Sequence, residues 1–363
     1  MSLLLLRILI FRESTRSNLR WLLTSRRSIF FFTAGLMRCS STGIERPSHL
    51  TNRRKNGLNY VLQYTSSRRR CAKDATGPKR FSASPIEYAG NMNSDFKIHC
   101  ITLCKNEVDV INVCLSRAIK WADYIYVYDG GSTDGTWEAV KGLNHPAIIP
   151  WKQDSKVFRE GLRAEVFNEF RHQSSKGDWW LQLNVDEFYV GNPRIFFSRV
   201  TRRQDFVWGI MAEYALTEKD ITSIDFSLPF EQVMPLLRYY YVAWSEPRAF
   251  RYRDGLIWNE DWAWPQHAGV IAKGRIVYKH YPCRSPKQLQ VRWNTRKENR
   301  DRGFEGWKEN MEACRQAIKN SKEFLFDDGI SPLKIDESAL PRHLEARYVR
   351  VLKQILHVCR VWP

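Results

Sequence analysis

From about residue 97 onward, the positions of apolar and polar residues follow two periods in turn. Short apolar runs rich in β-branched and aromatic residues, typical of strands, occupy 97–103, 124–128, 147–150 and 179–183. Apolar residues three or four positions apart, typical of one helix face, occur between these runs at 110–120, from 136 onward and at 159–172. This alternation predicts an α/β fold, with a mostly parallel sheet flanked by helices on both faces.

Beyond residue 187 the alternation is less regular. The pattern there predicts helices at 193–203 and 286–297, strands at 207–214 and 275–278, and a basic amphipathic helix at 342–361. Ser285 and Gln288 form a capping box around Pro286 at the first helical position, which marks the start of one of these helices. A stretch rich in Trp, Tyr and Arg, ending at His267, follows neither period.

The formal charge of +18 lies mainly in a leader, residues 1–91. The leader holds 17 Lys and Arg and four Asp and Glu, a net of +13, which leaves +5 for the other 272 residues. It is rich in Arg and Ser and has no sustained period, as in a transit peptide, a disordered arm or a segment outside the working protein. Its apolar runs are shorter than the roughly 20 residues that cross a bilayer, so we expect no transmembrane helix. The near balance of charge elsewhere argues against a nucleic-acid partner.

The eight cysteines do not form a recognisable framework. Cys100, Cys104 and Cys114 fall in a predicted strand and helix, without a C-x-x-C spacing. The others are scattered: Cys39, Cys71, Cys283, Cys314 and Cys359. We interpret them as reduced, buried thiols of a cytoplasmic protein, with no zinc site.

Polar clusters follow three of the predicted strands. They are Lys105 to Glu107, Asp129 to Asp134, and Asn184 to Glu187. In open parallel sheets, ligands bind outside the carboxyl ends of the strands. We therefore expect these three clusters to converge, although they are far apart in the sequence.

The segments CITLCKNE, YVYDGGSTDGT and WWLQLNVDEF, in this order between Phe96 and Phe188, resemble the nucleotide-binding half of the family 2 glycosyltransferases. The resemblance implies a GT-A fold in which residues 92–190 bind the nucleotide, residues 191–330 bind the acceptor, and residues 331–363 form a tail. It also implies transfer of a sugar, with inversion, from a nucleotide-diphospho-sugar to a hydroxyl of a glycan or lipid-linked glycan. The expected cofactor is Mg²⁺ or Mn²⁺, and a UDP-sugar is the expected donor.

Two other classes of protein are weaker alternatives. A sugar-phosphate nucleotidyltransferase would use a related sheet, but Lys105 to Asp109 is not the Gly- and Arg-rich loop expected after its first strand. A basic nucleic-acid-binding protein is disfavoured by the charge distribution. Peripheral membrane contact through the basic tail helix is compatible with the glycosyltransferase interpretation.

The resemblance implies a set of donor-binding residues: Asn106, Glu107, Asp129, Asp134, Arg163 and Asn184. Asp129 could accept a hydrogen bond from a uracil imide, or it could simply form an Asx turn. Asp134 could instead cap the helix at residue 136. Arg159, Arg248 and Arg251 could also clamp the diphosphate, and surface charge is the alternative for each arginine.

The expected metal ligands are Asp186 and His280. Asp186 keeps a position of the family's D-x-D-type motif, whereas Asn184 stands where the family has the first carboxylate and could bind ribose instead. One carboxylate together with a diphosphate can still hold Mg²⁺ or Mn²⁺. The alternatives are a solvated acidic loop at Asp186 and Glu187, and a structural role for His280.

The family's catalytic base is expected in an acidic pair well after the metal motif. Here Glu260 and Asp261 form such a pair among aromatic residues, with Asp261 as the base and Glu260 orienting or replacing it. A surface acidic loop is the alternative, and Glu213 is the next candidate for the base. One or two of four tryptophans are expected to line the acceptor cleft, with core packing as the alternative: Trp244, Trp258, Trp262 and Trp264.

Overall fold

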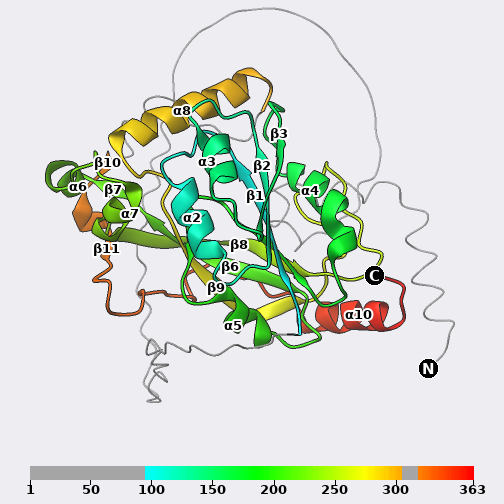
Figure 1. The fold of residues 1–363 in the computed structure, drawn as a ribbon. Helices are drawn as coiled ribbons and strands as arrows, with labels where there is room; N and C mark the ends of the chain where they lie inside the picture. The colour runs from blue at the N-terminus through cyan, green and yellow to red at the C-terminus, as the bar shows by residue number, and fades with distance from the viewer. Residues whose placement is uncertain (1–94, 305–317) are drawn as a thin grey trace, which may run out of the picture. The chain divides into compact units, whose positions relative to one another are not determined.

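The computed structural model describes residues 95–304 and 318–363 (Figure 1). The leader, and with it Cys39 and Cys71, lies outside the described residues, as does Cys314. The expectations for these positions therefore stay predictions. Among the described cysteines, Cys100, Cys104 and Cys114 are buried and unpaired, whereas Cys283 is half-buried and Cys359 is exposed.

Within the described residues, one sheet holds nine strands in the order β3-β2-β1-β4-β8-β6-β9-β5, with β11 pairing to β8. These strands are β1 Ile98–Cys104, β2 Tyr124–Asp129, β3 Ile148–Gln153, β4 Trp179–Gln182, β5 Glu187–Tyr189, β6 Phe206–Tyr214, β8 Tyr239–Arg251, β9 Ile271–His280 and β11 Leu325–Phe326. Strands β1 to β4 pair in parallel, while β8 runs antiparallel to β4 and β6. The prediction of an α/β fold with a largely parallel sheet is confirmed, although the half that contains β8 is mixed.

The remaining elements complete the fold. A separate two-stranded ladder joins β7 Leu216–Thr217 to β10 Ile318–Lys319. The α-helices are α2 Ile111–Ala118, α3 Thr136–Gly142, α4 Leu162–Phe170, α5 Pro193–Ser198, α6 Glu218–Ser223, α7 Phe230–Val233, α8 Pro286–Asp301 and α10 Arg347–Val358. The 3₁₀-helices are η1 Arg171–Gln173, η2 Met234–Leu236 and η3 Ser321–Glu323. None of the helices in the described part of the chain is both long and apolar enough to span a membrane.

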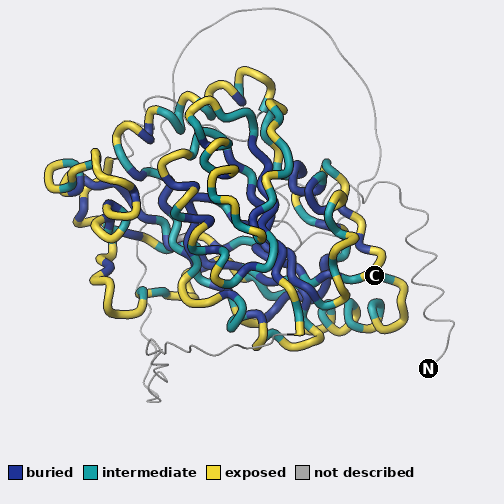
Figure 2. Tube along the Cα trace, viewed as in Figure 1, coloured by how far each residue is buried: buried dark blue, intermediate teal, exposed yellow. Residues whose placement is uncertain are grey.

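Helices cover both faces of the parallel strands, as the alternation of apolar residues predicts. Cys100 and Ile125 belong to the core cluster that includes residues of α2 and α3, whereas Ile101 and Tyr126 belong to the cluster that includes residues of α4. Successive residues of a strand point to opposite faces, so each strand contributes to both clusters. Figure 2 shows the buried residues gathered toward the centre, with the exposed ones toward the outside.

The largest difference from the expected elements is β8, which the sequence pattern does not reveal. This long strand crosses the middle of the sheet and carries Arg248, whose side chain is fully buried. Gly209 on the neighbouring β6 leaves room for it, because an added Cβ there would lie 2.7 Å from the Arg248 side chain. A charged residue inside a sheet interrupts the apolar pattern by which buried strands are predicted. Helix α5 is also shorter than predicted, since the poor helix formers Val200 and Thr201 follow it.

Candidate active site

The loops after β1 and β2 interlock through backbone-to-side-chain hydrogen bonds. The Asn106 backbone, in the left-handed region with φ of 56°, donates from its N–H to Ser132 Oγ at 2.8 Å. Asn106 Oδ1 accepts from the Thr133 N–H at 2.9 Å, and the Glu107 N–H donates to Thr136 Oγ1 at 2.8 Å. The first two polar clusters therefore meet at the carboxyl ends of their strands, as expected.

Asp129 organises the second of these loops from a buried position. Its Oδ1 accepts from the N–H groups of Gly131 at 2.9 Å and Ser132 at 2.7 Å, and from Gln153 Nε2 at 3.3 Å. Gly131 has a φ of 80°, which glycine adopts without strain. This is the Asx turn that the sequence left open as the alternative. Contact between Asp129 and a nucleotide base stays a prediction.

Asp134 ties the start of α3 to the loop after β1. Its Oδ1 accepts from the Thr136 N–H at 3.0 Å and the Thr136 hydroxyl at 2.5 Å, while Oδ2 accepts from the Val108 N–H at 3.1 Å. All these partners belong to the protein, and Thr136 lies at the helix start where the sequence offers a capping role. A direct contact of Asp134 with a donor is not tested by this geometry.

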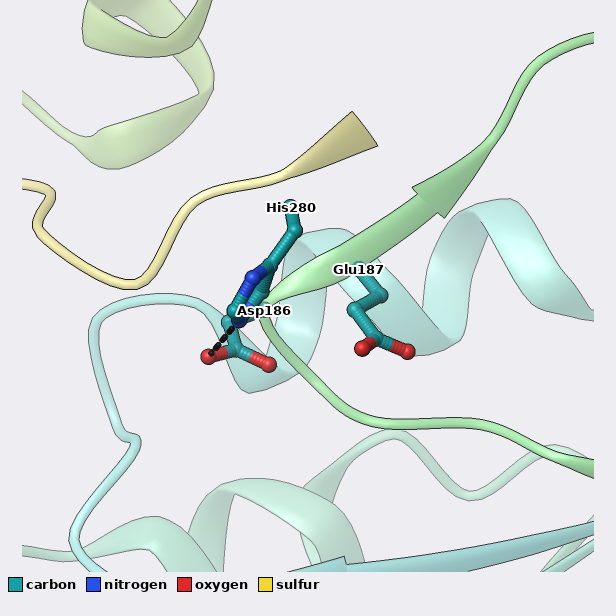
Figure 3. A group of neighbouring side chains, drawn as sticks. All are labelled: Asp186, Glu187 and His280. Carbon is teal, nitrogen blue, oxygen red and sulfur yellow. Dashed lines mark hydrogen bonds and ion pairs between the residues drawn. The ribbon is translucent and has the colours of Figure 1, made fainter. Parts of the chain in front are cut away.

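Asp186 and His280 face each other where β9 ends beside the loop between β4 and β5 (Figure 3). The His280 Nε2 and Asp186 Oδ2 atoms are 3.2 Å apart, and the Tyr281 N–H donates to the Asp186 carbonyl at 2.8 Å. Pairing of β5 with β9 sets Glu187 opposite His280. Two segments almost a hundred residues apart in the chain thus bring together both expected metal ligands.

Charges around the pair keep it ionised. Burial alone would lower the pKa of His280, but the Asp186 carboxylate and a contact with Glu213 outweigh it and raise the pKa to about 9. Burial would raise the pKa of Asp186, but His280, Arg292 and Arg284 hold it well below its usual range. Arg292 NH1 lies 3.8 Å from Asp186 Oδ2. The negative charge of the buried Asp186 carboxylate is therefore compensated by His280 at the end of β9 and by Arg292 on α8.

Glu187 is near the pair but is committed to another partner. One ligand atom each from Asp186, Glu187 and His280 falls within 4.8 Å of the others, which outlines a metal site. Both Glu187 oxygens, however, accept from the Arg248 guanidinium, at 2.7 and 2.8 Å. Figure 3 shows Glu187 to one side of the contact between Asp186 and His280. Glu187 is thus part of a buried ion pair, which leaves Asp186 and His280 as the two side chains best placed to act as ligands.

The donor set suits a divalent cation. Two ligands at right angles around an octahedral ion at about 2.1 Å are separated by about 3 Å, close to the observed 3.2 Å. Carboxylate oxygen and imidazole nitrogen are both acceptable to Mn²⁺, and Mg²⁺ prefers the oxygen. His280 Nδ1 is buried without a hydrogen-bond partner, and Glu213 Oε2 lies 3.6 Å from it. A carboxylate behind a histidine in this way commonly orients it toward a metal.

Arg163 reaches the site from α4. It is almost fully buried, and its NH2 donates to Asn184 Oδ1 at 3.1 Å. Asn184 in turn donates from Nδ2 to Glu187 Oε1 at 3.1 Å. The structure therefore joins Arg163 and Asn184, two of the expected donor-binding residues, beside the metal ligands.

The loop with Glu260 and Asp261 packs against the start of α4. Glu260 pairs with Arg159, and an added Cβ on Gly161 would lie only 1.5 Å from the Glu260 carbonyl oxygen. The Asp261 N–H donates to Asn259 Oδ1 at 3.0 Å. Within residues 95–304 and 318–363, no hydrogen bond or ion pair joins this loop to Asp186 or His280. The base assignment stays a prediction.

Two arginines of the site are not identified by the sequence analysis. Arg284, 1% exposed at its side chain, pairs with Glu107 and donates to both carboxylate oxygens of Asp109, at 2.8 and 2.9 Å. It locks the loop after β1 to the start of α8. Its place directly before Ser285, which caps the start of α8, is a signal that could have revealed it. Arg292 lies two turns into α8, where nothing in the pattern distinguishes it from surface charge.

The other arginines and the tryptophans divide between core and surface. Arg248 is buried in its ion pair, and Arg251 covers the Trp179 ring, with 4.4 Å from its guanidinium carbon to the ring centroid. The prediction that these two arginines clamp a diphosphate is not supported by their positions.

The four tryptophans considered for the acceptor cleft differ in exposure. Trp258 is in the core and Trp262 and Trp264 pack against it, whereas Trp244 is 51% exposed and donates to Glu246.

Comparisons with known proteins give only remote structural likeness. No family model matches the chain, and no curated protein matches it. Among solved structures, a mannosyltransferase from Pyrobaculum calidifontis, in complex with GDP-Man and Mn²⁺, is 14% identical. The match covers 62% of this chain and 69% of that one, with a TM-score of 0.32. A likeness this remote does not assign the chain to a family.

Proposed function

We propose that the described part of the chain transfers a sugar from a nucleotide-diphospho-sugar to an acceptor hydroxyl with a divalent metal. The observation that supports this most is the contact of buried Asp186 with half-buried His280 beside the strand ends, 3.2 Å apart. In its support, the strands that carry the three motifs are neighbours in the order β2-β1-β4, and ligands of open α/β sheets bind at the carboxyl ends of such strands. Bound Mg²⁺ or Mn²⁺ would neutralise charge on the leaving nucleoside diphosphate.

Residues of the chain itself take the other roles. Arg163 and Arg292 supply positive charge beside the pair, where a diphosphate would lie. Asn184 offers its amide to the ribose, and Glu213 positions His280. Asp261 remains the proposed base that takes the proton of the attacking hydroxyl. Trp244 is the exposed aromatic face on which an acceptor sugar can stack.

The test of the proposed function is a thermal-shift panel on the full chain with UDP- and GDP-sugars, each with and without Mn²⁺. A donor at about 100 times its Kd stabilises the protein by about 2.7 kcal/mol. We expect metal-dependent stabilisation by one nucleotide class, followed by slow release of the nucleoside diphosphate. Formation of pyrophosphate from a sugar phosphate and a nucleoside triphosphate would instead support a nucleotidyltransferase.

Asp186→Asn should weaken Mn²⁺ binding by about 100-fold or more, because it removes a ligand and not merely a group that orients one. Calorimetric titration with Mn²⁺ measures this directly. The backbone bond from Tyr281 to the Asp186 carbonyl is kept, so the fold should persist. Asp134→Asn is the matched control, since that carboxylate is bound to the protein. Equal affinity in Asp186→Asn and the wild type would remove the metal assignment.

Glu213→Gln should raise the Kd for Mn²⁺ by about 10- to 100-fold, because the amide no longer anchors the His280 ring by charge. Tyr241 donates to Glu213 Oε1 at 2.5 Å and can still donate to the amide oxygen. At saturating metal the turnover number should stay close to that of the wild type. A large fall in turnover at saturating metal would show that Glu213 has a chemical role.

A further inference from the structure

The described helix α10 turns its apolar side away from the protein. Five apolar residues at helical spacing form an apolar stripe, and all are exposed: Tyr348 76%, Val351 46%, Leu352 46%, Ile355 45% and Val358 83%. No residue of α10 is buried. The helix lies at the outside of the ribbon in Figure 1, and Figure 2 shows it without buried positions. Amphipathic surface helices normally bury their apolar side, so this orientation is inverted.

Polar side chains of α10 hold it to the protein from the other side. Lys353 pairs with Glu345 and donates to the Gly269 carbonyl at 3.5 Å. His357 Nδ1 contacts the Pro363 carbonyl at 2.6 Å, and the Trp362 ring stacks on His267 with centroids 4.0 Å apart. The helix therefore turns its polar face toward the protein, and the apolar stripe is left exposed among the described residues.

The charge of the tail that contains α10 indicates which kind of partner the apolar stripe meets. Residues 342–363 contain five Lys and Arg but a single acid, Glu345, which is already paired with Lys353. Two copies of such a helix would repel each other, whereas an anionic lipid surface attracts it and accepts the apolar side chains. Arg347 and Arg360 are exposed at the two ends of the helix, where they can reach lipid headgroups.

We propose that α10 docks the protein on an anionic membrane surface, with the apolar stripe inserted at the boundary between headgroups and acyl chains. The inference is independent of the proposed chemistry, because no residue of the stripe belongs to the candidate active site. It does not require a helix that spans the bilayer.

The test is sedimentation of the full chain with vesicles of phosphatidylcholine and phosphatidylserine in a ratio of about 4:1. The variant Tyr348→Gln with Val358→Gln removes the two most exposed apolar side chains of the stripe without changing the charge. Its partition coefficient should fall about tenfold or more. The matched control, Ile330→Gln with Leu228→Gln, changes two exposed apolar residues elsewhere and should bind like the wild type.

The basic leader also attracts anionic vesicles, so the comparison is repeated at about 0.5 M salt, where screening weakens that contribution. The difference between the two variants should persist there. Equal binding of both variants, or no binding of the wild type, would overturn the proposal. So would light scattering that shows a wild-type dimer and a monomeric Tyr348→Gln, Val358→Gln variant. If that variant loses its thermal transition, Leu352→Gln is tested against Ile330→Gln with the same expectations.

Discussion

Asp261→Asn should lower kcat by about 10²- to 10⁴-fold and leave the donor Kd nearly unchanged. A base that takes the acceptor proton acts in the transition state and contributes little to the donor complex. Asp261 lies on a loop that is anchored to α4, where Asn168 Nδ2 donates to the Trp258 carbonyl at 2.9 Å. Arg163, on the same helix, donates to Asn184 of the candidate site. The loop with Asp261 therefore lies on the same side of the sheet as that site.

The comparison variant for Asp261 is Glu260→Gln. Glu260 is exposed and pairs with Arg159, so its loss should cost little stability and little turnover. If Glu260→Gln is inactive while Asp261→Asn is normal, the role moves by one residue. Normal turnover in both variants, together with intact metal and donor binding, would mean that the base lies outside this loop or that no protein base is used.

The strand ends are the part of the site that the sequence predicts well. Strands β1, β2 and β4 follow from short apolar runs, and parallel pairing brings their polar ends together whatever lies between them. Asp186 and His280 are likewise at strand ends, so chain geometry places them side by side once β5 and β9 pair.

The sequence does not reveal which side chains of the site are paired with one another. Glu187 is adjacent to Asp186 and has the same type of side chain, but Arg248, 61 residues later, occupies both of its oxygens. Asp129 differs, because it is engaged by Gly131 and Ser132 of its own loop, in the Asx turn that the sequence offered as an alternative. Which carboxylate is free depends on partners that only the folded sheet brings near, and β8, which carries Arg248, has no regular apolar period.

Glu187→Gln should lower the free energy of unfolding by about 3 to 5 kcal/mol, because it removes the bidentate countercharge of the buried Arg248 guanidinium and leaves only Glu246, which contacts one of its nitrogens. The side chains are 0% exposed for Arg248 and 2% exposed for Glu187, so water cannot compensate. For a domain of this size, 1 kcal/mol corresponds to about 2 to 4 °C, and calorimetry should therefore show a fall in Tm of roughly 6 to 20 °C.

The same variant separates the two roles open to Glu187. If this carboxylate belongs to the ion pair and not to the metal site, Mn²⁺ affinity measured well below the lowered Tm should remain within a few-fold of the wild type. Arg248→Met is the matched variant of the other partner, because it removes the cation and leaves the charge of Glu187 buried. We expect this variant to be destabilised to a similar degree. A Glu187→Gln protein with normal Tm and lost Mn²⁺ binding would make Glu187 a metal ligand, and Arg248 would then be the group that holds it in place.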